Sequence, residues 1–379
     1  MLTYTYKFYR SKRTAKLDAM LREACFVWNH ALALQKWYYS LYGKYVSCSR
    51  LKAHFAKRIK RTRLHSQTTQ EILERLDVSY KRFFDRLSKR PPKFRRARDF
   101  TSIVYKQGGY RIDGNVLVVN SIRQHFQFSL SRPYEGKVKQ IRIKRSRLGE
   151  YYLYVVTDAV AGSCAHGKSH KGASVGMDFG LKTYLTLSNG TKIENPQFLK
   201  QGLSELRRKS RALSRCEKAS HHRRERRRDL ERCHERIRNR RDDWQWKTCR
   251  ELCGRYSVIC VEDLNLTGMT RLWGRKVNDL AFGAFVQKLE YTALKFGTEV
   301  VKVNRFYASS KTCSVCQYVN ERLSLADRRW VCPSCGASHD RDLNASVNIL
   351  RQGIASSGST RKTVLARRGA SATGESPSL

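Results

Sequence analysis

The first 160 residues pass from a strand-like repeat to a helical repeat and back. Residues 2–9, LTYTYKFY, alternate polar and apolar side chains, which predicts a half-buried strand. Apolar side chains then recur at helical spacing until Pro91 and Pro92, which cannot donate to a helix ladder. Residues 100–160 form short β-branched and aromatic runs separated by turns. We therefore expect an antiparallel β-barrel or small sheet, interrupted by a helical insert.

The second half repeats strand and helix patterns after a segment of small polar residues, 161–173, which we interpret as a linker. VGMDFGLKTYLTLSNGTKI, SVICVEDL and TEVVKVN predict strands, and residues 279–297 predict an amphipathic helix. From Gly353 onward the chain is rich in Ser, Gly, Thr and Arg, so we expect a disordered tail. No apolar run approaches membrane-spanning length and the first residues lack a signal-peptide core, so we expect a cytoplasmic protein with no membrane partner.

The chain is strongly basic. Its 379 residues include 76 Lys and Arg against 32 Asp and Glu, a formal net charge of +44. Such a surplus repels itself unless a polyanion neutralises it, which favours a nucleic-acid partner over small-molecule metabolism. Residues 201–250 carry 18 basic and 8 acidic side chains, so their net charge is 18 − 8 = +10. A solvated helix face is the alternative, but arginine, which pairs with phosphate through a planar fork, dominates. The predicted nucleic-acid contacts in this stretch are Arg207, Arg208, Arg211, Arg223, Arg224, Arg226, Arg227 and Arg228.

Four of the twelve cysteines are regularly spaced, as Cys313-x2-Cys316 and Cys332-x2-Cys335 with fifteen residues between the pairs. Two such knuckles bring four thiolates to the corners of a tetrahedron, which is typical of a zinc ribbon. Unrelated thiols or a redox pair are the alternatives. Four protein ligands leave no open position, so we predict one structural Zn²⁺. The other eight cysteines are scattered, as expected for reduced thiols.

Carboxylates stand where predicted strands end. Asp178 ends one apolar strand and Glu262 another, and Asp340 and Asp342 follow the cysteine cluster. Acids held at strand ends can converge on Mg²⁺, and two such ions can clamp the attacking and leaving oxygens of a phosphodiester. Each acid alone is more typical of a turn or a helix cap. Together, in so basic a chain, the acids are as consistent with a nuclease as with these structural roles.

A polar cluster at the start of a predicted helix offers a weaker signal. Gln67 and Gln70 lie in the segment HSQTTQ, and glutamine can read adenine in the major groove through two hydrogen bonds. A plain capped helix start accounts for the segment equally well. We keep base reading by these two glutamines as a hypothesis.

Several motifs in residues 171–350 resemble those of the TnpB family, the OrfB-type transposases of bacterial insertion sequences. They are DFGLK at 178–182, CHERIRNRRDD at 233–243, EDLNLTGM at 262–269, SSKTCSVC at 309–316 and HDRDLNA at 339–345. The sequence departs from the family pattern at Gln317, where glycine is usual, so this knuckle is expected to turn differently. The N-terminal half is similar in plan only.

The resemblance implies a bilobed α+β fold. A wedge β-barrel would comprise residues 1–10 and 98–160, with a helical recognition insert at 11–97. A RuvC nuclease domain of RNase H fold would comprise 174–305 and 338–352, with a zinc ribbon at 306–337 and the disordered tail at 353–379.

The resemblance also implies an RNA-guided DNA endonuclease, which cuts next to a short flanking motif in target double-stranded DNA. Its guide RNA would come from the right end of the transposable element, and we expect a nucleoid-associated monomer. Catalytic Mg²⁺, two ions in the expected mechanism, would be held by Asp178, Glu262 and Asp342. Asp342 is preferred to Asp340 because the family's third acid precedes the motif asparagine, here Asn344, by two residues. A non-cleaving RNA-guided repressor and a strand-transfer transposase are the rivals; the first is disfavoured by the three acids and the second by the zinc ribbon.

Overall fold

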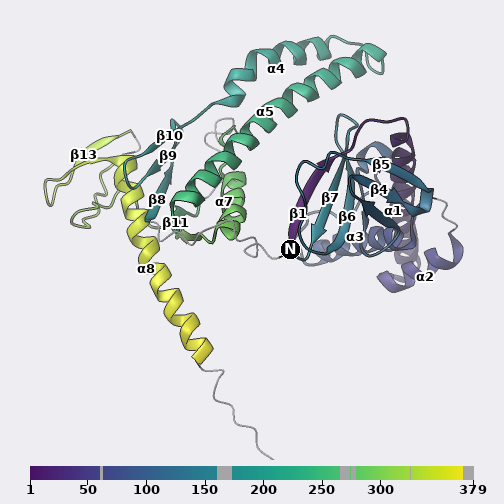
Figure 1. Ribbon diagram of the computed structural model, residues 1–379, viewed down its shortest axis with the longest axis horizontal. Helices are drawn as coiled ribbons and strands as arrows, with labels where there is room; N and C mark the ends of the chain where they lie inside the picture. Colours follow the sequence, from purple (N-terminus) through teal and green to yellow (C-terminus); the bar gives the residue numbers. More distant parts are fainter. Residues whose placement is uncertain (60–62, 160–172, 265–273, 275–278, 325, 370–379) are drawn as a thin grey trace, which may run out of the picture. The chain divides into compact units, whose positions relative to one another are not determined.

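The computed structural model describes the chain except for residues 60–62, 160–172, 265–273, 275–278, 325 and 370–379, and it leaves the side chains of 357–369 undescribed (Figure 1). Contacts divide the chain into two compact units, Met1–Val160 and Ala161–Leu379. The predicted linker 161–173 lies outside the described residues apart from Ala173. None of the described helices is long and apolar enough to cross a membrane.

The N-terminal unit contains two antiparallel sheets. The larger has the order β1-β7-β6-β2, and the smaller the order β3-β4-β5. A bridge between Phe8 and Phe128 links them, and the Tyr6 and Phe128 rings pack 5.3 Å apart in the core. The wedge was predicted as a barrel; the described residues form two sheets joined by this bridge. The strands are β1 (Leu2–Lys7), β2 (Ser102–Tyr105), β3 (Tyr110–Asp113), β4 (Val116–Val119), β5 (Gln124–Gln127), β6 (Val138–Arg145) and β7 (Tyr151–Thr157).

Three helices connect β1 to β2, as the helical repeat predicts: α1 (Thr14–Tyr42), α2 (Cys48–Arg58) and α3 (Ser66–Phe84). The apolar side of α1 packs into the core, where Leu17, Leu21 and Trp28 are almost fully buried. Its last buried residue is Gln35, about two turns before the helix ends at Tyr42. The end of α1 therefore carries no buried side chain.

The C-terminal unit is built on a five-stranded sheet with the order β10-β9-β8-β11-β12. β8 pairs antiparallel with β9 and parallel with β11, which pairs parallel with β12. Side chains of these strands alternate between two faces, so Val175, Met177 and Ile259 enter the core beneath α5 and α7 while Cys260 faces α8. The strands are β8 (Ser174–Phe179), β9 (Thr183–Leu187), β10 (Lys192–Glu194), β11 (Val258–Glu262) and β12 (Glu299–Val303).

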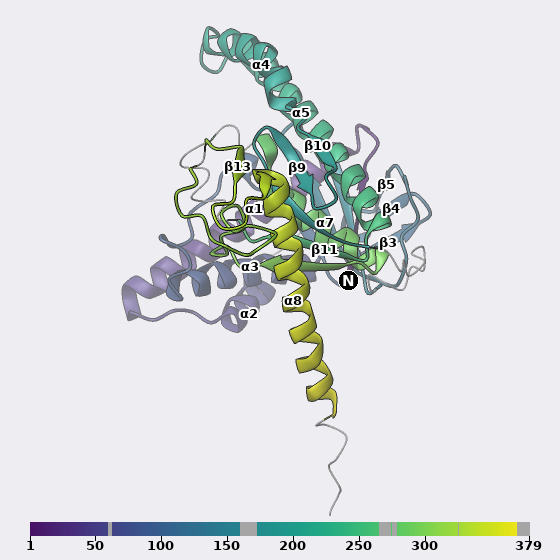
Figure 2. The same ribbon diagram turned by 90° about the vertical axis from the view of Figure 1, so that its left-hand side faces the viewer.

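Helices cover both faces of this sheet. α7 (Phe282–Phe296) packs with α5 (His221–Arg255), and α8 (Arg341–Gly369) lies along β8, β11 and β12. α4 (Phe198–Ser214) and the N-terminal half of α5 form a hairpin that projects from the sheet (Figures 1 and 2). A small hairpin of β13 (Arg329–Val331) and β14 (Ser338–Asp340) precedes α8.

The end of α8 differs from the prediction. The helix continues to Gly369, so residues 353–369 are helical where we expected a disordered tail. No proline interrupts this stretch, and its Ala, Arg, Lys and Leu residues favour helix. The predicted disorder of 370–379 lies outside the described residues.

Candidate functional site

Parallel pairing brings the first two acids to the same edge of the sheet. β8 and β11 pair from Ser174–Val258 to Met177–Val261, so the next pair in register is Asp178 and Glu262. Adjacent strands lie about 4.8 Å apart, and side chains in register point to the same face. Both acids therefore emerge on the α8 face, where strand alternation also places Gly176 and Cys260.

Close packing of α8 on β8 brings the third acid to them. A Cβ on Gly176 would lie 2.1 Å from the Ser346 carbonyl oxygen and 2.6 Å from the Leu350 nitrogen, so only glycine lets the helix approach. Asp342 is one turn before Ser346 on the same helix face. Asp178 is two residues after Gly176 on the same strand face, so the two acids lie on facing surfaces.

The electrostatics of Asp178 reflect this arrangement. Burial, and after it the neighbouring carboxylates of Asp342 and Glu262, raise the pKa of Asp178 to about 8. Burial also raises the pKa of Glu262. The raised pKa values mean that this arrangement disfavours the ionised carboxylates, and a divalent cation would relieve that cost.

Asp340 has a different environment. Its Oδ1 accepts the backbone N–H groups of Asp342 and Leu343 at 3.0 and 3.2 Å, which caps the start of α8. Its Oδ2 lies 3.1 Å from the Lys192 ammonium, and hydrogen bonding and this cation lower its pKa despite partial burial. Asp340 therefore acts as a helix cap, whereas the Asp342 carboxylate interacts with Asp178 and lies 3.3 Å from the Arg328 guanidinium.

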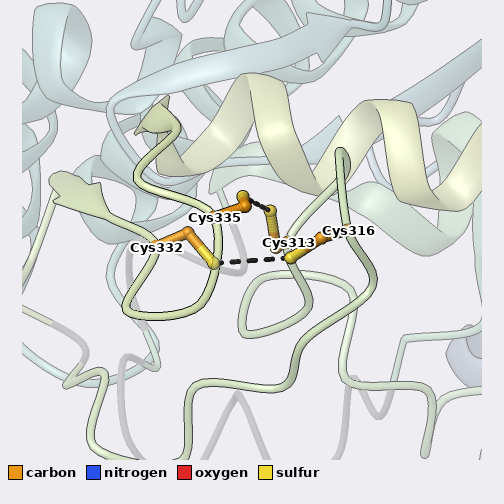
Figure 3. Close-up of side chains that lie close together, drawn as sticks. All are labelled: Cys313, Cys316, Cys332 and Cys335. Carbon is orange, nitrogen blue, oxygen red and sulfur yellow. Dashed lines mark hydrogen bonds between the residues drawn. The ribbon is translucent and has the colours of Figure 1, made fainter.

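The four predicted cysteines come together, with their sulfurs all within 4.8 Å of one another (Figure 3). Cys313 and Cys335 sulfurs are 3.7 Å apart, and those of Cys316 and Cys332 are 3.6 Å apart. A tetrahedron with Zn–S bonds of about 2.3 Å has sulfurs about 3.8 Å apart, so this geometry fits one zinc ion. Among the described residues no other set of three or more such side chains is as closely grouped; the three acids are more widely spaced.

The two knuckles have the same backbone turn. Gln317 has φ +66° and Gly336, at the equivalent position of the second knuckle, has φ +72°. Each donates its backbone N–H to the first cysteine of its pair, Gln317 to Cys313 at 3.0 Å and Gly336 to Cys332 at 2.9 Å. The expectation that Gln317 changes the turn is wrong. Glutamine adopts the left-handed conformation that glycine adopts more easily.

Two asparagines to which the sequence analysis assigned no contact, Asn344 and Asn348, join the cysteine cluster to α8. Asn344 donates to the Thr312 carbonyl at 2.7 Å and accepts the Ser314 N–H at 2.9 Å. Asn348 donates to the carbonyls of Ser309 and Thr312. Their spacing of four residues places both on one helix face, which is the signal that could have identified them. The Cys313 loop is thereby fixed to the helix that carries Asp342.

The predicted arginines lie on the α4–α5 hairpin. Seven of the eight are exposed, as a nucleic-acid surface requires: Arg207, Arg208, Arg211, Arg224, Arg226, Arg227 and Arg228. Arg223 differs from the predicted exposed contact. It is partly buried and donates to the carbonyls of Leu213 and Cys216 at 3.1 and 2.8 Å, so it holds the end of α4 against α5.

The two glutamines separate in the structure. Gln67 is partly buried, and its side-chain oxygen accepts the backbone N–H groups of Gln107 and Gly108 at 3.2 and 3.0 Å. Two-bond reading of adenine needs that oxygen, so the hypothesis for Gln67 is replaced by a role in bracing α3 against the β2–β3 turn. Gln70 is exposed.

The chain is similar to known proteins over most of its length. Residues 153–272 match the family model described as probable transposase, of the OrfB type, and residues 282–349 match the Cas12f1-like TNB domain. A Streptomyces pristinaespiralis protein named for RNA-guided DNA endonuclease activity is 31% identical over 76% of this chain and 71% of its own length. Escherichia coli K12 InsQ, named likewise, is 26% identical over 88% of this chain and 87% of its own.

The fold has a solved counterpart. The Cas12f1 protein of a Cas12f1–sgRNA–target DNA complex superposes with a TM-score of 0.57 at 14% identity, covering 89% of this chain and 83% of that chain. A TnpB-like protein of Acanthamoeba polyphaga mimivirus, L79, is 36% identical over 34% of this chain and 25% of its own. From the extent of the Streptomyces match and the two family models, the chain belongs to the TnpB family of insertion-sequence proteins.

Proposed function

We propose that this chain is an RNA-guided DNA endonuclease whose nuclease centre is formed by Asp178, Glu262 and Asp342. One observation carries the proposal: Asp178 and Glu262 lie on adjacent parallel strands, and Asp342, on the helix packed against that face of the sheet, acts electrostatically on Asp178. The relatives named for this activity, from Streptomyces and Escherichia coli, support it.

The strand order supports an RNase H-like, RuvC-type nuclease. Strands β8, β9 and β10 form an antiparallel meander, and β11 and β12 extend the sheet beyond β8 as parallel strands. Asp178 lies on β8 and Glu262 on the neighbouring β11. Residues 306–337 would form the zinc ribbon inserted before the third acid, holding one structural Zn²⁺ through its four cysteines. The N-terminal unit would supply the wedge, with residues 11–97 as the recognition insert.

The three acids fit a catalytic magnesium centre. Their mutual repulsion is relieved by divalent cations, which bring Lewis-acid activation of water and charge neutralisation at the phosphate. Asp178 interacts electrostatically with both other acids, so the three would hold the cations as one group. Asp340 and the Asn344 contacts would hold the first turn of α8, and hence Asp342, in position.

The partners would be a guide RNA from the element's right end and target double-stranded DNA. Base pairing would select the target, while the protein holds backbones and reads a short flanking motif. The exposed arginines of the α4–α5 hairpin would contact phosphates, and Gln70 remains a candidate for the flanking motif. The enzyme would act as a monomer on cytoplasmic, nucleoid DNA.

Plasmid cleavage by the full chain, purified with its co-expressed guide RNA, tests the proposal. We expect Asp178→Ala and Glu262→Ala each to abolish cutting in Mg²⁺ and to leave guide-dependent DNA binding intact. Asp263→Ala is the matched control, because this acid adjoins Glu262 but pairs with Arg305. Binding without cutting by the unmodified chain would favour the repressor, and joined DNA products would favour the strand-transfer transposase.

A further inference from the structure

The end of α1 exposes an unusual number of aromatic side chains. In residues 36–42, KWYYSLY, the exposed fractions are 59% for Trp37, 64% for Tyr39 and 59% for Tyr42. The helix has no buried residue beyond Gln35, so this aromatic tip, residues 36–42, extends past the core of the N-terminal unit. Aromatic residues at helical spacing usually mark a core face, and here they do not. An exposed apolar group of this size is typical of a binding surface.

A second segment adds another exposed ring beside the tip. The Lys36 ammonium lies 4.7 Å from the centroid of the Phe94 ring, which is itself 54% exposed. The segment is anchored to α1, since Trp28 donates to the Lys93 carbonyl and Asn29 exchanges hydrogen bonds with Arg95. Rings from two parts of the chain are therefore held on one helix.

The surrounding charge indicates what covers these rings. Residues 24–70 contain nine Lys and Arg and no Asp or Glu, and residues 86–98 contain seven Lys and Arg and no acid. The acids of α3 lie between these segments, but Glu74 pairs with Lys52 and Asp77 with Lys81, so the cations remain in excess. Two copies of this chain meeting through the tip would bring these cationic segments together, which opposes self-association. Cations interleaved with exposed rings are the chemistry of single-stranded nucleic acid, whose phosphates pair with the cations while bases stack on the rings.

We propose that the aromatic tip and Phe94 form a platform on which unpaired bases of RNA stack. RNA recognition targets unpaired bases of this kind, whereas a duplex keeps its bases stacked on one another. The inference rests on the proposed function in that the RNA would be a single-stranded part of the guide. It adds a binding site in the N-terminal unit, apart from the nuclease centre.

The test compares RNA binding by the full chain and by the variant W37L/F94L, which keeps apolar side chains but removes the rings. The probes are an unstructured adenosine homopolymer RNA and an RNA duplex with the same number of phosphates. We expect the variant to bind the homopolymer more weakly by about tenfold for each ring, with an unchanged salt dependence and unchanged duplex affinity.

Two control variants accompany the test. W37F keeps a ring at this position and should retain most of the homopolymer affinity that W37L loses. Y9L removes a 56%-exposed ring outside the platform and should have no effect.

Unchanged homopolymer affinity, or an equal loss on the duplex, would overturn the platform. So would a wild-type dimer in light scattering that W37A/F94A converts to monomer, because the tip would then be a protein interface. Plasmid cleavage by the unmodified chain separates this proposal from the nuclease. Ring-dependent RNA binding by an unmodified chain that never cuts DNA would refute the nuclease and retain the platform, whereas DNA cleavage with ring-independent RNA binding would do the reverse.

Discussion

Asp340 and Asp342 differ in what their carboxylates contact, although one residue separates them. We expect Asp342→Ala to abolish DNA cleavage, because it removes the only one of the two acids that interacts with Asp178. Asp340→Ala should keep cleavage and lower the free energy of unfolding by about 1 kcal/mol through loss of the helix cap. Cleavage assays with parallel denaturant unfolding measure both. If Asp342→Ala still cleaves DNA and Asp340→Ala does not, Asp340 is the third catalytic acid.

The left-handed Gln317 is a second residue whose effect can be measured. Gln317→Gly should be more stable than Gln317→Ala by about 1 kcal/mol in the zinc-loaded protein, because glycine adopts φ +66° without steric conflict. The two variants are matched, since both lose the hydrogen bond from the Gln317 side chain to the Cys313 carbonyl and only alanine keeps the backbone strain. Thermal unfolding checks the order. Equal melting temperatures for the glycine and alanine variants would show that backbone strain contributes nothing.

Among the elements, α8 depends on its contact with β8. Gly176→Ala should destabilise the C-terminal unit by about 3 kcal/mol or more, because the added Cβ meets helix backbone at 2.1 Å and not a movable side chain. Gly254→Ala on α5 is the matched control, with only the Phe296 ring at 3.9 Å, and should be neutral or stabilising. Denaturant unfolding measures the difference. A Gly176 variant as stable as the control would mean that α8 does not pack as described.

The cysteine cluster is the second element with a measurable role. Cys332→Ser should lower bound zinc and destabilise the C-terminal unit, since folding of such ribbons draws largely on the metal. Because Asn344 and Asn348 attach the Cys313 loop to α8, cleavage should fall as well. Cys216→Ser, outside the cluster, is the control. Elemental analysis measures the bound zinc, and wild-type protein without stoichiometric zinc would show that the four cysteines do not form a zinc site.

The sequence alone predicted which helices and strands form better than it predicted where they end and which distant residues their side chains contact. Alternation and helical spacing identified β8, β11 and α7, and the spacing of Cys313 to Cys335 identified the cluster, because these signals are local. The roles of Gln67 and Arg223 depend on backbone groups brought near by folding, which no local pattern encodes. The same holds for Gly176, whose need for glycine arises from a helix about 170 residues later in the chain.

For the whole molecule, net charge governs association. We expect log affinity for DNA to fall steeply with log salt, with each phosphate contact adding about −0.9 to the slope. Charge reversal at Arg224, Arg226, Arg227 and Arg228 should flatten the slope and weaken matched and mismatched targets alike, since phosphate contacts carry no sequence information. Arg223→Ala should instead lower the melting temperature. Binding isotherms over a salt series measure the slope, and a flat slope would mean that the basic surface is solvated and unused.

The order of the acids along the chain has a consequence for synthesis. Asp178 and Asp342 are 342 − 178 = 164 residues apart, and α8, which carries the second, packs on strands made long before it. Domains generally fold as units in the order of translation. If the proposed platform binds RNA, the N-terminal unit would hold RNA on the ribosome while the carboxylate group is still incomplete. A nascent chain that stalls before residue 342 would hold RNA without the means to cut the chromosome beside which it is made.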